Sequence, residues 1–128
     1  STEGTEMKYP YSDLTEKIIG AAINVHKTLG PGYPEKIYQR ALKEEFMKFR
    51  LPFVRERKFD VYYNDKNVGY ETVDFCLFDK IIVELKSTKE ILDIHAKQLV
   101  GYLRASNFKL GLILNFGKGK LEIKRVIV

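Results

Sequence analysis

The sequence contains a single cysteine, Cys76, and no tryptophan. One thiol cannot form an intrachain disulfide, and it cannot supply the several thiolates of a structural zinc site. Cys76 lies in an apolar run, where a buried and unreactive thiol is expected. These features argue against a disulfide-stapled secreted domain. They suit a reducing compartment, so we expect a cytoplasmic protein.

The sequence also lacks long hydrophobic runs. No apolar stretch approaches the roughly 18 residues that a membrane-spanning helix needs, and the first residues have no apolar signal core. Residues 1–10 are polar and without pattern, so we expect a disordered leader or a remnant of cloning there. Residues 11–128 contain no repeat or linker, which predicts one domain with no membrane partner.

Core-forming residues and basic residues are well represented. Hydrophobic residues make up 45% and aromatic residues 12% of the 128 positions, which is enough for a core. The 22 Lys and Arg residues exceed the 17 Asp and Glu residues, for a net charge of +5. This balance favours polyanionic partners such as nucleic acid, although a charge of this size is also common on domains that only need to be soluble.

The apolar spacing is helical at the start of the chain and strand-like further on. Asp13 and Glu16 form a capping-box pattern that predicts the start of the first helix. The predicted helices cover residues 14–29, 34–50 and 89–105, and the predicted strands cover residues 58–63, 68–78, 81–86, 110–116 and 121–128. This order predicts an α/β fold, with a mixed β-sheet flanked by helices and a parallel crossover through the third helix.

The third predicted strand carries two charged residues, Glu84 and Lys86. Residues two apart in a strand share a face, so these side chains project together while Val83 and Leu85 point into the core. If residues 78–80 form a three-residue hairpin loop, Asp74 of the preceding strand lies directly opposite Glu84. Opposed Cβ atoms are about 4.5–5.5 Å apart, and two bare carboxylates at that distance repel each other.

A hard divalent cation would remove this conflict, because Mg²⁺ is typically held by one or two carboxylates together with waters and phosphate oxygens. Such an ion can acidify a bound water and stabilise charge on a phosphate. Lys86 would then place the water or neutralise the developing anion. Asp74, Glu84 and Lys86 therefore indicate a metal site that cleaves phosphodiester bonds. From these three residues alone, an ion pair on a solvated strand face remains an open interpretation.

Two predicted helices carry further candidates. Gln98 and Tyr102 share a helix face, where Gln98 could orient a water or a phosphate oxygen, although a half-buried helix face would explain the pair equally well. Glu35 either interacts with the helix dipole or supplies a third carboxylate to the metal. Candidate substrate contacts are Tyr102, Tyr38 and His95, and His95 could equally be structural.

Several of these residues lie in motifs that resemble those of the GxxExxY protein family. Gly32-Tyr33-Pro34-Glu35-Lys36-Ile37-Tyr38 matches the motif that names the family. Further matches are Val25-His26, Val73-Asp74-Phe75, Val83-Glu84-Leu85-Lys86, His95-Ala96-Lys97-Gln98-Leu99 followed by Tyr102-Leu103, and Asn115-Phe116-Gly117. The resemblance extends over residues 14–128.

That family is similar to a branch of the PD-(D/E)XK nuclease superfamily, close to the RecB-type exonuclease domain. The resemblance implies a restriction-endonuclease-like αβββαβ core and phosphodiester cleavage that depends on Mg²⁺ or Mn²⁺. It also implies a role for each matching residue: metal-binding acids at Asp74, Glu84 and Glu35, a catalytic lysine at Lys86, and the helix motif at Gln98 and Tyr102.

The leading hypothesis is therefore a metal-dependent nuclease, with DNA expected as substrate in preference to RNA. The alternative is a non-cutting nucleic-acid-binding or protein-interaction module on the same fold. Such a module has no need of two opposed carboxylates beside a lysine. Because the domain is small, a homodimer or a partner chain could complete the substrate channel.

Overall fold

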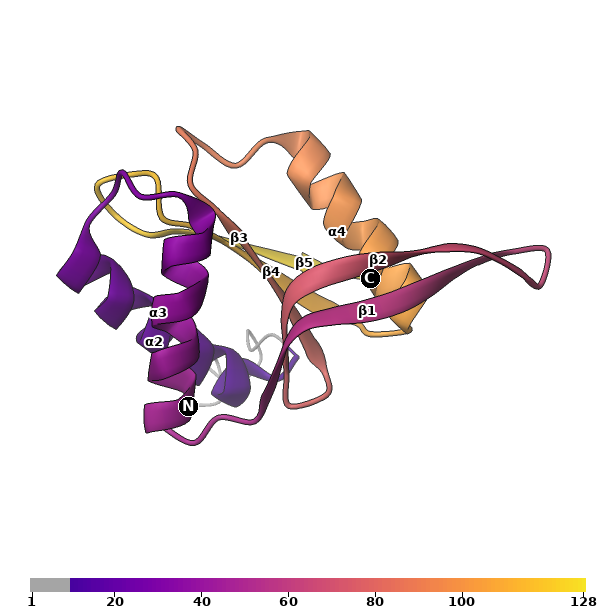
Figure 1. Cartoon of the computed structure of the whole chain (residues 1–128), viewed down its shortest axis with the longest axis horizontal. Helices are drawn as coiled ribbons and strands as arrows, with labels where there is room; N and C mark the ends of the chain where they lie inside the picture. The colour runs from indigo at the N-terminus through magenta and orange to yellow at the C-terminus, as the bar shows by residue number, and fades with distance from the viewer. Residues whose placement is uncertain (1–9) are drawn as a thin grey trace, which may run out of the picture.

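The computed structural model describes residues 10–128 (Figure 1), so the predicted leader lies almost wholly outside the described residues. Over the described residues the elements follow the predicted order. They are α2 (Ser12–Leu29), α3 (Glu35–Lys48), β1 (Phe53–Tyr63), β2 (Lys66–Leu77), β3 (Ile81–Lys86), α4 (Asp93–Ser106), β4 (Leu110–Asn115) and β5 (Glu122–Ile127). No helix in this part of the chain is long and apolar enough to cross a bilayer.

Helix α2 begins slightly earlier than predicted. Its N-cap is Tyr11, in a left-handed conformation with φ 56°, and no side chain caps the helix. The predicted Asp13 cap is therefore wrong. Asp13 lies in the first turn instead, where a negative charge is favourable to the helix dipole. Gly30 ends the helix as predicted: at φ 70° its N–H donates to the carbonyl oxygen of His26.

The strands form one five-stranded sheet in the order β1-β2-β3-β4-β5. Strands β3 and β4 are parallel, and the other neighbouring pairs are antiparallel. This confirms the α/β class with a mixed sheet flanked by helices. Strand β1 starts at Phe53, earlier than predicted, and its hairpin with β2 extends well beyond the rest of the sheet (Figure 1).

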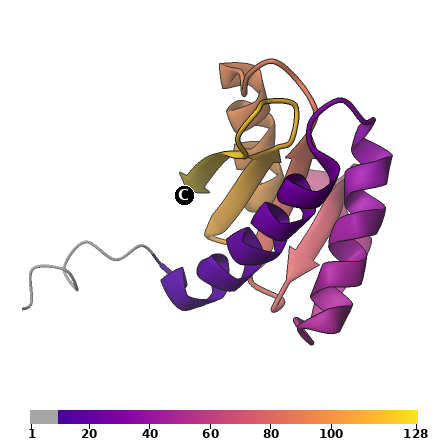
Figure 2. The same ribbon diagram turned by 90° about the vertical axis from the view of Figure 1, so that its left-hand side faces the viewer.

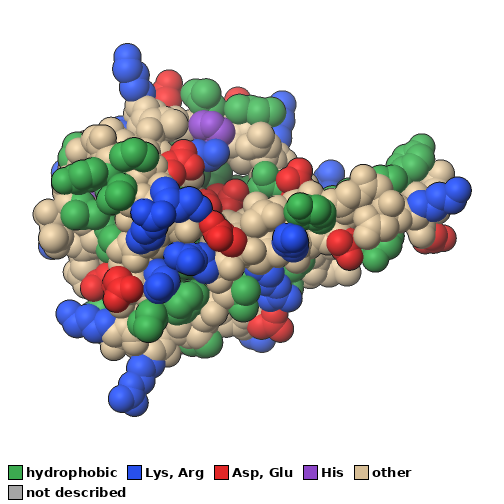
Figure 3. All heavy atoms as spheres, in the orientation of Figure 1, with side chains coloured by type: hydrophobic (Ala, Val, Ile, Leu, Met, Phe, Trp, Pro, Cys, Tyr) green, Lys and Arg blue, Asp and Glu red, His purple; other side chains and the backbone are tan. Residues whose placement is uncertain are grey.

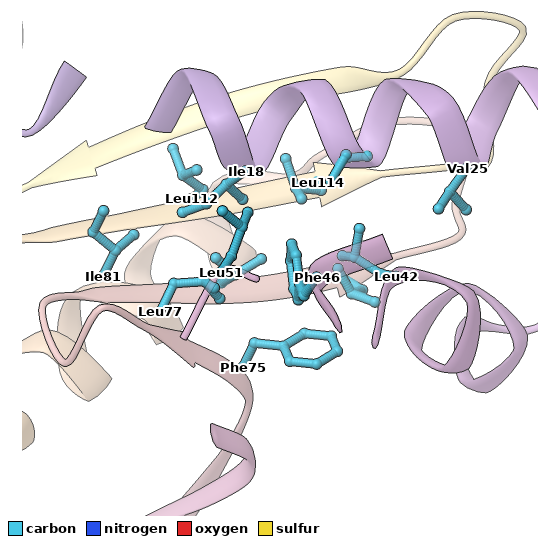
Figure 4. Packing of buried hydrophobic residues seen from close by; sticks show 14 of the residues in the cluster. Ile18, Val25, Leu42, Phe46, Leu51, Phe75, Leu77, Ile81, Leu112 and Leu114 are labelled. Carbon is cyan, nitrogen blue, oxygen red and sulfur yellow. The ribbon is translucent and has the colours of Figure 1, made fainter. Parts of the chain in front are cut away.

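Helices cover both faces of the sheet (Figure 2). One face packs against α2 and α3, where Ile18 and Phe46 meet Phe75 and Leu112 in the larger core (Figure 4). The other face packs a smaller cluster against α4, with Leu99 and Leu103 among its buried members. Residues that alternate along the central strands are thus buried on both sides.

Candidate active site

The predicted hairpin register between β2 and β3 is confirmed. The strands pair Leu77 with Ile81 and Phe75 with Val83, and the next position in the same register sets Asp74 opposite Glu84. The pairing of the two strands stops before that position. From there the β1–β2 hairpin diverges from β3 (Figure 1). The two carboxylates therefore lie where the sheet forks.

The backbone changes direction at Asp74. Val73 packs in the cluster under α4, whereas Phe75, only two residues on, packs in the core under α2 and α3. Regular strand alternation would put both on one face. On the neighbouring strand Glu56 is left-handed, with φ 55°, between the paired residues Arg55 and Arg57. This local twist takes Asp74 out of the regular alternation and into the fork.

Each of the two carboxylates binds the backbone at the fork. The N–H of Asp74 donates to Oε2 of Glu84 at 2.6 Å, and the N–H of Leu85 donates to Oδ2 of Asp74 at 2.8 Å. These side-chain bonds stand where the next backbone–backbone hydrogen bonds between β2 and β3 would be. Both side chains are half-buried. In the space-filling view, acidic side chains gather in a hollow in the middle of this face, with basic side chains beside it (Figure 3).

The surroundings of Glu84 favour its protonated form. Burial raises the pKa of Glu84 to about 8, and the charge of Asp74 adds to the rise. The bond from the Asp74 N–H and the charge of Lys86 act in the opposite direction, with smaller effect. Without a cation, Glu84 therefore favours its protonated form at neutral pH.

Lys86 ends strand β3 on the same side as Glu84, as predicted. Val83 and Leu85 are buried in the opposite core, whereas Glu84 and Lys86 are half-buried. The backbone position of Lys86 is well defined, since its carbonyl oxygen accepts the N–H of Phe116 at 2.8 Å. The ammonium group is close enough to lower the pKa of Glu84 by its charge.

Helix α3 supplies a residue that the sequence analysis missed. Nε2 of Gln39 donates to Oδ1 of Asp74 at 3.0 Å. The Gln39 side chain is 3% exposed, and its Oε1 is buried without a hydrogen-bond partner. A signal was available in the sequence, because Gln39, Leu42 and Phe46 follow helical spacing on the buried face of α3. A glutamine on such a face needs a polar partner.

Glu35 does not join the acid pair. It is exposed at the first position of α3 and lines a separate hollow with Tyr33, Ser87 and Thr88. Within residues 10–128 no group of three or more His, Cys, Asp or Glu side chains could hold a metal ion. The structure thus brings Asp74 and Glu84 together and does not bring Glu35 to them as a third carboxylate. Glu35 is exposed at the helix N-terminus, whereas Gln39, one turn further along the same side of α3, is buried.

Tyr38 is a core residue, which corrects its prediction as a substrate contact. Its side chain is fully buried and stacks on Phe116 at 4.5 Å between ring centroids. Its hydroxyl donates to the carbonyl oxygen of Gly30 at 2.5 Å and accepts the N–H of Tyr33 at 3.2 Å. With the ring covered and the hydroxyl occupied, Tyr38 ties the loop before α3 to the core.

Two of the predicted residues on α4 face the hairpin. Gln98 and Tyr102 line a hollow of about 580 Å³ between α4 and the β1–β2 hairpin, together with Tyr62 and Glu71. Burial raises the pKa of the Tyr102 hydroxyl, and the charges of Glu84, Glu71 and Asp74 raise it further. Tyr102 is therefore within electrostatic reach of the acid pair.

His95 stabilises the start of helix α4. Its Nδ1 accepts the backbone N–H of Leu92 at 3.0 Å, which caps the start of α4. His95 is not among the residues that line the hollow with Gln98 and Tyr102. The structural alternative for His95 is therefore the one that its contacts favour.

The donor atoms at the fork suit a hard divalent cation. Asp74 and Glu84 offer carboxylate oxygens, and the buried Oε1 of Gln39 is an amide oxygen without a partner. Such oxygens are the ligands that Mg²⁺ and similar ions prefer. Thiolate and imidazole ligands, which suit softer metals, are absent from the described contacts of the pair.

Comparison with known proteins agrees with the fold. The family model of the PD-(D/E)XK nuclease superfamily matches residues 12–126. The chain therefore belongs to the PD-(D/E)XK nuclease superfamily, and its mixed sheet with flanking helices is the restriction-endonuclease-like core of that class. Members of this superfamily are typically nucleases, generally use divalent metals and act on nucleic acid.

A solved structure, the crystal structure of SSO0001, is similar to this chain with a TM-score of 0.58 and 18% sequence identity. The match covers 91% of this chain and 57% of that protein, so this chain spans little more than half of its length. At this identity the likeness shows the fold alone. A search of curated proteins finds no significant match.

Proposed function

We propose that the chain is a metal-dependent nuclease that hydrolyses phosphodiester bonds, with Mg²⁺ or Mn²⁺ as its cation and DNA rather than RNA as its substrate. The observation that carries this proposal is the carboxylate pair of Asp74 and Glu84 at the fork of the sheet. Because the pKa of Glu84 is raised to about 8, Glu84 favours its protonated form at neutral pH. A divalent cation is the natural replacement for that proton.

In this proposal Asp74 and Glu84 hold the cation. When bound, the cation would acidify a water and stabilise negative charge on the phosphate. Lys86, beside Glu84 at the end of β3, orients the attacking water or neutralises charge that develops on the phosphate. Gln98 and Tyr102 guide the substrate along the hollow between α4 and the hairpin, where both side chains are accessible.

The proposal also includes the family branch of the chain and its protein partners. The motifs at residues 32–38, 83–86 and 95–102 support membership of the GxxExxY family, in the RecB-type branch. A homodimer or a partner chain would extend the short substrate path that one copy offers. The single cysteine, Cys76, is buried, and its pKa is raised by burial, which suits the proposed cytoplasmic location.

A cleavage assay tests the proposal. The protein is incubated with single- and double-stranded DNA and RNA in Mg²⁺, in Mn²⁺ or with chelator. We expect cleavage of DNA that chelator abolishes and that Lys86→Ala and Asp74→Ala each lower by about 100-fold or more. Lys120→Ala removes an exposed lysine elsewhere and should leave the rate unchanged.

The same assay separates the proposal from its rival. Absence of cleavage with every substrate and cation, or cleavage that is unchanged in Lys86→Ala and Asp74→Ala, would contradict a nuclease at this site. Tight DNA binding without cleavage would favour the non-cutting module on the same fold.

A further inference from the structure

Gln39 is the buried polar group that the assigned roles leave unexplained. It lies on the inward face of α3 beside Leu42 and Phe46, and it is 3% exposed. Its Oε1 has no hydrogen-bond partner. Buried amide oxygens almost always have one, so an orphaned oxygen beside an acid pair calls for a ligand.

The amide of Gln39 occupies the open side of Asp74. Oδ2 of Asp74 already accepts the N–H of Leu85, and the backbone N–H of Asp74 is taken by Glu84. Only Oδ1 faces α3, where Nε2 of Gln39 donates to it at 3.0 Å. Glu56 is the other carboxylate near this amide, but it is exposed and pairs with Lys36 at 2.6 Å.

We propose that Gln39 supplies the third protein oxygen to the divalent cation, in the place where the sequence suggests Glu35. The inference rests on the proposed metal-dependent function. Two oxygens next to each other around Mg²⁺, each bound at 2.0–2.1 Å, are separated by about 3 Å. That is the present spacing between the Gln39 amide and Oδ1 of Asp74.

A half-turn of the amide about its last side-chain bond completes the arrangement. This rotation exchanges Oε1 and Nε2, which have nearly the same shape. It sets the carbonyl oxygen beside Asp74 and places the NH₂ group where Oε1 now lies. Because Oε1 has no hydrogen-bond partner at present, the exchange breaks no bond of Oε1. In the cation-free protein the NH₂ group offsets the charge of Asp74, and the rotated amide would share the cation with it. Two ionised carboxylates and one neutral oxygen balance a divalent charge.

The test compares two substitutions that separate ligation from hydrogen-bond donation. Gln39→Met keeps the length of the side chain and removes both polar atoms, whereas Gln39→Glu keeps an oxygen ligand and removes the donor. Arg40→Ala, on the exposed face of the same helix turn, is the control. Mn²⁺ affinity is measured at pH 7 by calorimetry and by the electron paramagnetic resonance of free Mn²⁺. Melting in chelator checks the fold, and Gln39→Leu replaces Gln39→Met if that variant does not fold.

We expect Gln39→Met to lower Mn²⁺ affinity by about 10- to 100-fold, and Gln39→Glu and Arg40→Ala to keep at least the affinity of the unmodified protein. Equal affinity in Gln39→Met and the unmodified protein would overturn the inference. Loss of affinity in both Gln39 variants would also overturn it, because Gln39 would then act only as a donor to Asp74. If the unmodified protein binds no Mn²⁺, or if Asp74→Ala binds it equally well, the metal site itself fails, and the proposed function fails with it.

Discussion

The two carboxylates of the site have different surroundings. Asp74 accepts a hydrogen bond on each oxygen, from Gln39 and from the N–H of Leu85. The raised pKa of Glu84 follows first from its burial and then from the charge of Asp74. Glu84 therefore favours its protonated form at neutral pH, and a cation that binds there would displace that proton.

This difference predicts a pH-dependent stability for the cation-free protein. Glu84 has a pKa of about 8 in the folded state and an ordinary value of 4.5. Between these values the folded state binds more protons than the unfolded state, so stability falls as pH rises from about 4.5 to about 8. The slope from this one group is at most about 1.4 kcal/mol per pH unit.

Urea unfolding in chelator, at a series of pH values, measures the effect. Glu84→Gln should flatten the curve over the same window, since the amide does not titrate. Identical pH slopes for the two proteins would show that Glu84 does not hold the proton.

At the scale of elements, the segment that follows β3 is fixed by hydrogen bonds from Asn115, the last residue of β4, and we call this arrangement the clamp. The buried side chain of Asn115 accepts the N–H groups of Thr88 and Gly117 through Oδ1, and its Nδ2 donates to the carbonyl oxygen of Thr88. Gly117 lies so close to Thr88 that a Cβ added there would be 2.2 Å from its carbonyl oxygen and 2.4 Å from its nitrogen. Thr88, which the clamp holds, is two residues after Lys86.

This clamp predicts a contrast between two glycines of one turn. Gly117→Ala should destabilise the protein by about 1–3 kcal/mol, because the added methyl group meets backbone that cannot move without opening the clamp. Gly119→Ala is the matched control, since an added Cβ there has nothing within 4 Å, and it should change stability by less than about 0.5 kcal/mol. Denaturant unfolding measures both, and equal effects would contradict this account of the clamp.

The sequence predicted the elements whose patterns are local. The three-residue loop at residues 78–80 set the register that opposes Asp74 to Glu84, and the alternation in β3 set the common side of Glu84 and Lys86. The capping pattern at Asp13 was misleading, because the helix starts two residues earlier, at Ser12, with Tyr11 as its N-cap.

What the sequence could not predict depends on tertiary placement. The twist at Asp74 goes with a left-handed Glu56 on the neighbouring strand, a conformation that no glycine signals. Glu35 and Gln39 are one turn apart on the same side of α3, and only Gln39 is buried against the sheet, a difference that depends on how α3 lies on it. The burial of Tyr38 follows from the same packing, since the motif alone does not show which of its side chains face the core.

At the scale of the whole molecule, the site lies where the packed sheet ends and the free hairpin begins. Below the fork, both faces of the sheet are covered by helices. Beyond it, the hairpin carries exposed aromatic side chains such as Tyr62 and Tyr63, which are 62% and 69% exposed. A rigid core thus holds the carboxylates while the hollow beside α4 stays open to a large substrate.

The central claim is that the Asp74–Glu84 pair holds a divalent cation, and proton release on cation binding tests it most directly. Calorimetric titration with Mg²⁺ in two buffers of different ionisation enthalpy counts the protons released. With a pKa of about 8 for Glu84, binding should release up to about one proton at pH 7 and clearly less at pH 9. Glu84→Gln should release none. Binding without proton release at pH 7, or a release that persists in Glu84→Gln, would contradict the claim.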